Sequence, residues 1–309
     1  MRIGILGGGQ RHAGGRRRGG GVRWWILVVF AIYAAWQWFG SAQPDPYTGE
    51  QARYAGSADE DVHLGAQAYA QVVRDASVQG ALLPADAPAS VQVRGIAQRL
   101  IAKVPEVSTE LAAAHGQQAP THYRTFEWDV SVIQSDDANA FCLPGGKMAV
   151  FTGLLPVAQN EDALAVVMGH EIAHALLRHG SQRMQQQKLV QMGQLAAVLA
   201  TGDMAPQQRQ VLMGVLGAGA AYGFVLPYGR EHETQADEVG LMLAAAACYD
   251  PAEAIPLWQR MAQLGGGSRP PEFASTHPDP ANRIQRLQAL LPQAQAMRAK
   301  YCGGGARDF

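Results

Sequence analysis

The sequence predicts an α+β domain that is mostly helical, contains one small antiparallel sheet and is preceded by one N-terminal transmembrane helix. Apolar residues recur at helical spacing along most of the chain. Only residues 125–134, which alternate, and residues 139–153, which carry a Pro-Gly-Gly turn, are typical of strands. A run of sixteen uncharged residues, 24–39, stands apart near the N-terminus. With 309 residues, of which 48% are hydrophobic, the chain is long enough to bury a sizeable core.

The N-terminus and the rest of the chain differ in charge. Residues 1–23 form a glycine-rich leader with six arginines and no acidic residue. Beyond the leader, 19 Lys and Arg residues stand against 26 Asp and Glu residues, so the body is mildly acidic. A mildly acidic body lacks the basic surface that nucleic acids require, and we expect no nucleic-acid partner.

Residues 24–42 predict a membrane anchor. Tryptophans flank the apolar run at both ends, as in the aromatic belts of membrane-spanning helices. The alternative is a cleaved signal peptide, because Gly40 and Ala42 are small enough for a cleavage site. In either case the arginines stay in the cytoplasm and residues 43 onward are exported. We therefore expect the protein to bind a membrane through this helix.

The exported part is expected to consist of a linker and one domain. Residues 43–57 are rich in turn-forming residues, which predicts the linker. The domain covers residues 58–301, with a helical N-terminal part, 58–120, and a core, 121–291. The weakly apolar stretch Val211–Leu226 favours a buried helix, or one that touches the membrane surface, over a second span.

Helices account for most of this domain. Helical patterns cover residues 58–79 and 90–104 ahead of the strands. After the strands, Asn160 is placed to cap a helix that continues to about residue 200, and acidic residues occupy its first turn. The remaining helices are expected at residues 230–247, after Pro251 and at residues 281–291. The three cysteines are too few for a disulfide framework, although one bridge between Cys248 and Cys302 is possible.

Residues 169–180, GHEIAHALLRHG, concentrate three histidines and one glutamate. Residues four apart share one face of a helix, so His170 and His174 can face the same ion. Glu171 is poorly directed to chelate beside them, but it can reach a water at that ion. This is the H-E-x-x-H arrangement of two zinc-binding imidazoles and a general base. On an unbroken helix His179 would lie about 180° from His170, so we expect it to make a polar contact at a helix end.

A catalytic zinc needs a third protein ligand and an open position. Glu233 and Asp237 lie four apart in the predicted helix 230–247 and so share one face. We expect Glu233 to be the third ligand, and Asp237 to accept a hydrogen bond from a ligand imidazole. His232 is a weaker candidate ligand. Together these residues predict one Zn²⁺ per chain.

These motifs resemble those of a known family. HEIAH, followed by REHETQAD at residues 230–237, looks like the zinc metallopeptidases related to HtpX, the CAAX prenyl endopeptidases and the mitochondrial Oma-type proteases. NAFCLPGGKMAVFTGLL and STHPDPANRIQRL are similar to segments of the exported bacterial branch that includes BepA and LoiP. The resemblance covers about Thr125 to Leu290 and implies a gluzincin-type metallopeptidase domain. It assigns the zinc ligands to His170, His174 and Glu233, the general base to Glu171, and the outer hydrogen bond to Asp237.

The resemblance also predicts location and substrates. It implies a zinc metalloendopeptidase that cleaves unfolded or misfolded exported proteins. We expect a single-pass protein of the bacterial inner membrane with its catalytic domain in the periplasm. A mitochondrial inner-membrane protease is the less favoured alternative, because residues 1–23 have no serine and too much glycine for a good presequence. The rival from another class is a zinc-containing, chaperone-like binding protein with latent or no protease activity. Such a protein would have no use for the base Glu171.

Two further segments are candidates for roles in catalysis. His277 ends a long loop where related enzymes keep a histidine, and it could donate a hydrogen bond to the oxyanion. Alternatively, His277 could bind zinc in the open position and keep the enzyme latent. An edge strand could pair with an extended substrate backbone, or belong to an ordinary hairpin that supports the catalytic helix. Its residues are Asn139, Ala140, Phe141, Cys142 and Leu143.

Overall fold

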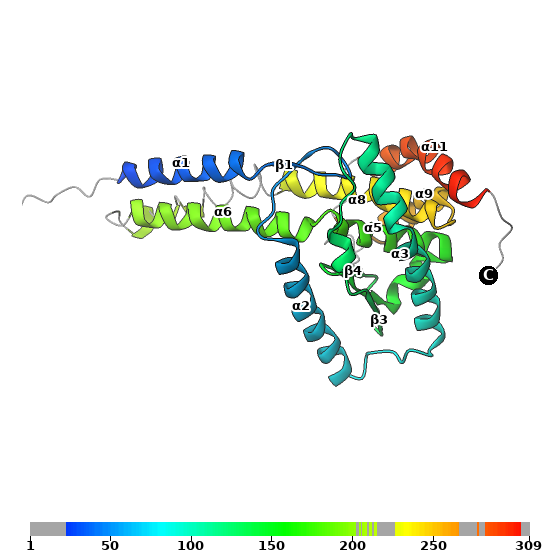
Figure 1. Cartoon of the computed structure of the whole chain (residues 1–309). Helices are drawn as coiled ribbons and strands as arrows, with labels where there is room; N and C mark the ends of the chain where they lie inside the picture. The colour runs from blue at the N-terminus through cyan, green and yellow to red at the C-terminus, as the bar shows by residue number, and fades with distance from the viewer. Residues whose placement is uncertain are drawn as a thin grey trace, which may run out of the picture.

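The computed structural model describes residues 23–201, 204, 206–208, 210–211, 213–214, 226–265, 277 and 282–303. Figure 1 shows a compact helical body from which two helices project side by side. The expected α+β architecture, mostly helical, is confirmed. The α-helices are α1 (Trp24–Gly40), α2 (Ala58–Val78), α3 (Pro88–Ala114), α4 (Leu155–Ala158), α5 (Glu161–Leu176), α6 (His179–Ala200), α8 (Leu226–Ala246), α9 (Ala254–Gly265) and α11 (Arg283–Cys302). The strands are β1 (Gln43–Pro44), β2 (Gln51–Ala52), β3 (Asp129–Ile133), β4 (Ala140–Leu143) and β5 (Lys147–Phe151).

The predicted anchor is a helix, α1, but its expected role as a membrane span is not supported. Its 17 residues rise about 26 Å, whereas a bilayer core is about 30 Å thick. Among the described residues, no helix combines the length and the apolar character needed to cross a membrane. Most of the predicted helix Val211–Leu226 lies outside the described residues.

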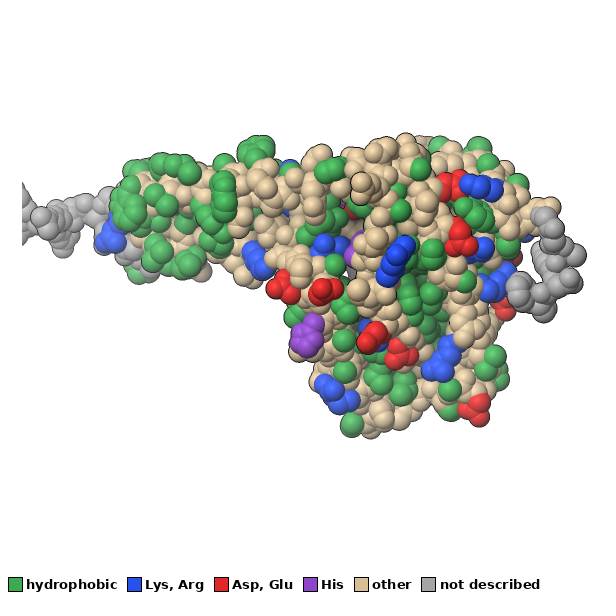
Figure 2. Space-filling view, viewed as in Figure 1, with side chains coloured by type: hydrophobic (Ala, Val, Ile, Leu, Met, Phe, Trp, Pro, Cys, Tyr) green, Lys and Arg blue, Asp and Glu red, His purple; other side chains and the backbone are tan. Residues whose placement is uncertain are grey.

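α1 runs antiparallel to α6, and these two helices form the projection in Figure 1. The backbone N–H of Arg23 donates to the carbonyl of Ala200 at 2.9 Å, which joins the start of α1 to the end of α6. Phe30 packs so close to Gly193 that a Cβ on this glycine would lie 3.2 Å from the ring. Apolar side chains cover the outside of the projection (Figure 2). The large exposed ones are Trp24, Trp25, Val28, Val29, Ile32, Trp36, Phe39, Met192, Leu195, Val198 and Leu199.

The predicted linker, residues 43–57, is a folded part of the body. β1 and β2 pair antiparallel, and the segment is therefore a hairpin. Tyr47 is buried, and the Asp45 carboxylate accepts hydrogen bonds from the Tyr47 N–H at 2.8 Å and from the Tyr54 hydroxyl at 3.0 Å. Ser57 ends the hairpin segment and caps α2. Burial of Tyr47 and Asp45 fixes the segment on the body, which its turn-rich composition did not predict.

The main sheet has the strand order β3-β5-β4. β4 and β5 form the expected antiparallel hairpin, and Gly145 and Gly146 supply the positive φ angles of its turn. β3 joins β5 in parallel, so the sheet is mixed. β4 is an edge strand, since β5 is its only strand neighbour among the described residues. It lies against the catalytic-helix candidate α5.

The centre of the body is the contact between α5 and α8. Gly169 and Gly240 let the two helix backbones approach, because a Cβ on Gly240 would lie only 2.6 Å from the backbone nitrogen of His170. α11 also packs against α8. The bridge between Cys248 and Cys302, which the sequence allowed, is present and ties the loop after α8 to the end of α11. Cys142 is a buried free thiol.

Candidate metal centre and catalytic site

Helix α5 carries the first three candidate residues into the interior. The side chain of Asn160 accepts a hydrogen bond from the Ala163 N–H and starts the helix as predicted. Of its 16 residues, 13 are buried, His170 and Glu171 among them. Its four-residue spacing brings the Nε2 atoms of His170 and His174 to 3.0 Å from each other. Both imidazoles therefore present the same nitrogen to one point.

Helix α8 supplies the carboxylate at that point. Glu233 Oε2 lies 3.3 Å from His170 Nε2, and Glu233 Oε1 lies 3.6 Å from His174 Nε2. His277 Nδ1 lies 3.4 Å from His170 Nε2. One ligand atom from each of these four residues lies within 4.8 Å of every other. Three imidazole nitrogens and one carboxylate oxygen are a donor set that suits Zn²⁺, so these residues could hold the ion.

The outer nitrogen of His170 faces the second predicted acidic residue. His170 Nδ1 lies 3.0 Å from Asp237 Oδ1, in the arrangement expected for a metal-binding histidine. Arg283 donates to the same oxygen and also lies 3.5 Å from Glu233 Oε2. Its guanidinium stacks on Trp258 at 3.3 Å from the ring centre. Arg283 is 1% exposed, and its burial between α8 and α9 had no signal in the sequence.

The outer nitrogen of His174 faces another histidine. His179 Nδ1 lies 2.8 Å from His174 Nδ1, so the polar contact that we expected His179 to make at a helix end is a contact with the candidate ligand itself. The physical reason is a break in the helix: Arg178 adopts a left-handed conformation with φ 54°, and α6 starts afresh at His179. His232 stacks on His179, with ring centres 4.1 Å apart, and is not among the four clustered ligand atoms.

Glu171 is placed where a proton acceptor could work. It is 2% exposed, and its Oε1 has no hydrogen-bond partner among the described residues. His277 Nε2 lies 3.6 Å from this oxygen. Burial raises the pKa of Glu171, and the nearby His277 and His170 oppose the rise. A buried carboxylate oxygen beside the cluster, with no hydrogen-bond partner among the described residues, is available to accept a proton from a water.

Before any ion binds, the ligand residues differ in the protonation state that they favour. Burial disfavours a charged His170, but hydrogen bonds to Asp237 and Glu233 outweigh it and raise the pKa of His170 to about 9. Burial also opposes ionisation of Glu233, but hydrogen bonds from His170 and His277 hold the pKa of Glu233 far below its usual range. Burial lowers the pKa of His174. An arriving cation would therefore replace a proton on His170.

The predicted substrate strand lies beside this cluster. Asn139, Ala140 and Cys142 are buried, and Phe141 and Leu143 are half-buried. Cys142 is close enough to Glu171 to feel its charge, and burial together with that charge raises the pKa of the Cys142 thiol. β4 thus runs alongside the catalytic-helix candidate, with its thiol protonated.

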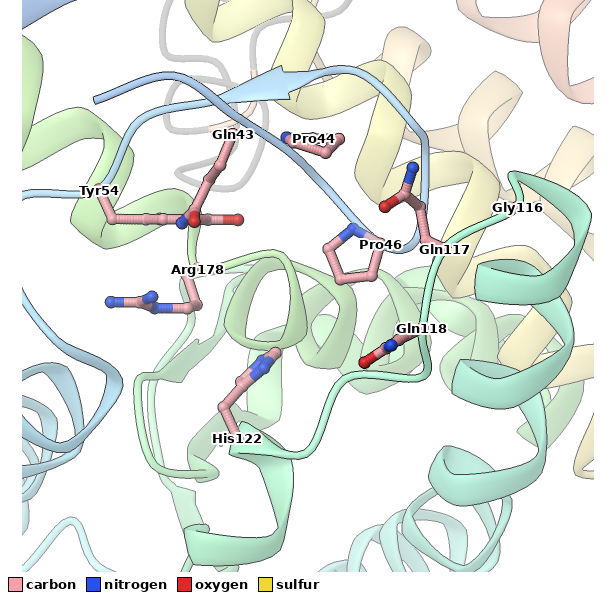
Figure 3. Close-up of a pocket in the computed structure, with 9 residues that line it drawn as sticks. All are labelled: Gln43, Pro44, Pro46, Tyr54, Gly116, Gln117, Gln118, His122 and Arg178. Atoms are coloured by element: carbon pink, nitrogen blue, oxygen red, sulfur yellow. The ribbon is translucent and has the colours of Figure 1, made fainter. Parts of the chain in front are cut away.

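A separate cavity of about 510 Å³ lies between the hairpin segment and the body (Figure 3). The predicted site residues are not among those that line it. Arg178 forms part of its wall and holds the surrounding elements together. Its guanidinium donates to Asp61 at 2.8 Å and to the carbonyl of Gly56 at 2.7 Å. The lining residues are Gln43, Pro44, Pro46, Tyr54, Gly116, Gln117, Gln118, His122 and Arg178.

Comparisons with known proteins agree with this geometry. A family model described as Peptidase family M48 matches residues 99–291, more than half of the chain. The chain is 34% identical to the mitochondrial metalloendopeptidase OMA1 of Schizosaccharomyces pombe, over 78% of this chain and 64% of that protein. It is 36% identical to the mitochondrial metalloendopeptidase OMA1 of Homo sapiens, over 55% of this chain and 34% of that protein. It is 30% identical to the beta-barrel assembly-enhancing protease of Escherichia coli, over 60% of this chain and 37% of that protein. The chain thus spans less than two thirds of the length of these relatives.

The matches confirm the predicted resemblance to a metallopeptidase family, and the four clustered ligand residues could hold the metal that such a family uses. The matches contradict the expected location. Relatives from several organisms are mitochondrial proteins, so the prediction of a bacterial inner-membrane location with a periplasmic catalytic domain is wrong. That prediction used the apolar run at residues 24–39, which forms α1 alongside α6.

Proposed function

Because the chain belongs to peptidase family M48, we propose that it is a zinc metalloendopeptidase that hydrolyses peptide bonds in unfolded or misfolded proteins. One observation carries the proposal: the ligand atoms of His170, His174 and Glu233 converge beside a buried Glu171 oxygen that has no hydrogen-bond partner among the described residues. A site that only stabilises the fold needs no such carboxylate. A site that activates water does.

The proposed reaction divides the work between the ion and Glu171. Zinc, when bound to the three ligands, supplies a Lewis acid that polarises the scissile carbonyl and makes water more acidic. Glu171 accepts the proton of the attacking water and delivers it to the leaving amine. Its raised pKa brings this carboxylate closer to the pH at which it can both take and give a proton. Asp237 holds His170 in orientation through the outer ring nitrogen.

His277 has two possible roles in this reaction. As a hydrogen-bond donor to the oxyanion it would accelerate cleavage. As a fourth ligand in the open position it would keep the enzyme latent. The 3.4 Å between His277 Nδ1 and His170 Nε2, and the 3.1 Å to Glu233, support the second role, because they put this imidazole among the ligand atoms. We therefore propose that this structure is the latent form.

The substrate class follows from the edge strand. β4 lies along α5 and has one side of its backbone without a strand partner among the described residues. An extended peptide could pair there through main-chain hydrogen bonds, which select for an extended backbone more than for side chains. Unfolded segments meet this requirement, whereas folded proteins seldom expose an extended backbone. The beta-barrel assembly-enhancing protease of Escherichia coli, which is similar to this chain, is also a protease by its name.

The deciding experiment measures zinc content and casein cleavage for the full chain and for its Glu171→Gln variant. We expect about one zinc in both proteins, with cleavage lost by about a hundredfold or more in the variant, since a general base contributes 10²–10⁴-fold. Glu161→Gln, on the exposed start of the same helix, is the matched control and should cleave normally. Folded lysozyme should be spared. If the wild type and a His277→Ala variant both bind zinc and cleave nothing, the peptidase proposal fails and a chaperone-like binding role takes its place.

A further inference from the structure

We propose that His179 is a positioning residue for the zinc ligand His174, and that Glu50 on the β1–β2 hairpin completes the hydrogen-bonded chain behind it. The inference builds on the proposed zinc site and goes beyond it in two ways. It gives His174 an outer partner of a different kind from the Asp237 carboxylate behind His170. It also connects the metal site to the hairpin segment that precedes the catalytic domain.

The polar atoms form one continuous chain. His179 Nδ1 lies 2.8 Å from His174 Nδ1, and His179 Nε2 lies 2.9 Å from Gln235 Oε1. Gln235 Nε2 in turn donates to Glu50 Oε2. These contacts join residues on α5, α6 and α8 to the hairpin segment, 185 positions before Gln235.

Only one set of proton positions satisfies every link. A histidine that binds zinc through Nε2 carries its proton on Nδ1, so His174 Nδ1–H must donate to an unprotonated His179 Nδ1. The remaining proton of neutral His179 is then on Nε2, where it donates to the amide oxygen of Gln235. The amide nitrogen of Gln235 is left to donate to the Glu50 carboxylate. Each donor thus meets an acceptor, and the chain ends on the group best able to accept.

The surroundings hold His179 in this place. The ring of His232 stacks on it, with an interplanar angle of 15°. His179 and Gln235 are 4% and 8% exposed, so water competes little for their hydrogen bonds. Arg178 adopts a left-handed conformation, with φ 54°, and α6 begins at the next residue, His179. Hydrogen bonds from its guanidinium to Asp61 and to the carbonyl of Gly56 hold Arg178 in place. A residue that only ended a helix would need none of these contacts.

The test separates hydrogen bonding from packing with two variants of His179. Asn places a side-chain oxygen near the position of Nδ1 and so keeps an acceptor for His174, whereas Phe keeps a ring for stacking and has no nitrogen. Zinc dissociation constants are measured on the full chain by competition with a chelator, and the cobalt-loaded proteins are compared by visible absorption. We expect His179→Phe to bind zinc 10–100-fold more weakly, with a changed cobalt spectrum. His179→Asn should recover most of the affinity and the wild-type spectrum.

The second experiment tests Glu50, at the hairpin end of the series of hydrogen bonds. Glu50→Ala should weaken zinc binding by a smaller factor, whereas Glu127→Ala, an exposed carboxylate elsewhere, should leave it unchanged. In casein cleavage, His179→Phe should lower kcat with little change in KM. The inference is overturned if the Phe variant binds zinc within about threefold of wild type, or if Asn and Phe lose affinity equally. Zinc binding is measured independently of cleavage, so a failure of the proposed peptidase activity would be seen separately, as zinc bound without proteolysis.

Discussion

His277 Nδ1 lies 3.1 Å from each carboxylate oxygen of Glu233, although 44 residues separate the two in the sequence. The contact brings His277, which comes from beyond α9, into the cluster of proposed zinc ligands. An imidazole in this place would occupy the position that a catalytic zinc keeps open for water and substrate.

Removing this imidazole should therefore activate the enzyme. We expect the His277→Ala variant to keep its zinc and to cleave casein about tenfold faster, which corresponds to roughly 1.4 kcal/mol for displacing the ligand. His63→Ala, an exposed histidine on α2, is the control. Slower cleavage by His277→Ala at full zinc content would assign His277 to stabilisation of the oxyanion.

The buried Arg283 should be needed for stability as well as for the site. Its guanidinium pairs with the buried carboxylates of Asp237 and Glu233, and replacement by Met removes this positive charge from both. Breaking a buried ion pair from one side costs about 3–5 kcal/mol, so thermal unfolding of Arg283→Met should shift strongly downward. Gln285→Met, on the exposed face of the same helix, should unfold close to wild type. Equal melting temperatures for the two variants would show that Arg283 is dispensable.

The close approach of α5 and α8 predicts opposite effects for two glycine-to-alanine changes. A Cβ on Gly240 would lie 2.6 Å from the His170 nitrogen, whereas a Cβ on Gly95 in α3 would meet nothing within 4 Å. Gly240→Ala should push the helices apart, cost about 1–3 kcal/mol and lower zinc affinity. Gly95→Ala should stabilise by about 0.5–1 kcal/mol, because alanine favours the helix. Chemical unfolding measures both, and a neutral Gly240→Ala would contradict the packing argument.

Stability should fall below about pH 6.5 through His122. Burial lowers the pKa of His122 from its ordinary value of 6.5, and its Nε2–H donates to the carbonyl of Leu176. As the pH falls through 6.5 the unfolded chain takes up the proton before the folded chain does, so the free energy of unfolding decreases. His122→Gln keeps a donor but does not titrate. Its unfolding free energy, measured between pH 8 and pH 5, should decline less than that of the wild type. Parallel curves would exclude a contribution from His122.

Local spacing determined much of the candidate site. His170 and His174 share a helix face because they are four residues apart, and Glu233 and Asp237 do so for the same reason. The caps and turns that are local in sequence were also predictable, as Asn160 and the Pro-Gly-Gly hairpin turn show. Each of these features depends on backbone geometry within a few residues.

Contacts between distant segments decided the rest. Arg178 breaks the helix that would have turned His179 away from His174, and Arg283 is buried only because α8 and α9 surround it. Glu50 meets Gln235 only because the hairpin segment folds onto the body. The apolar run at residues 24–39 shows the same limit, since its composition predicts an apolar helix but not the segment that this helix packs along. Because the hydrophobic effect is non-directional, it does not select a packing partner, and only the tertiary structure shows that α1 packs along α6.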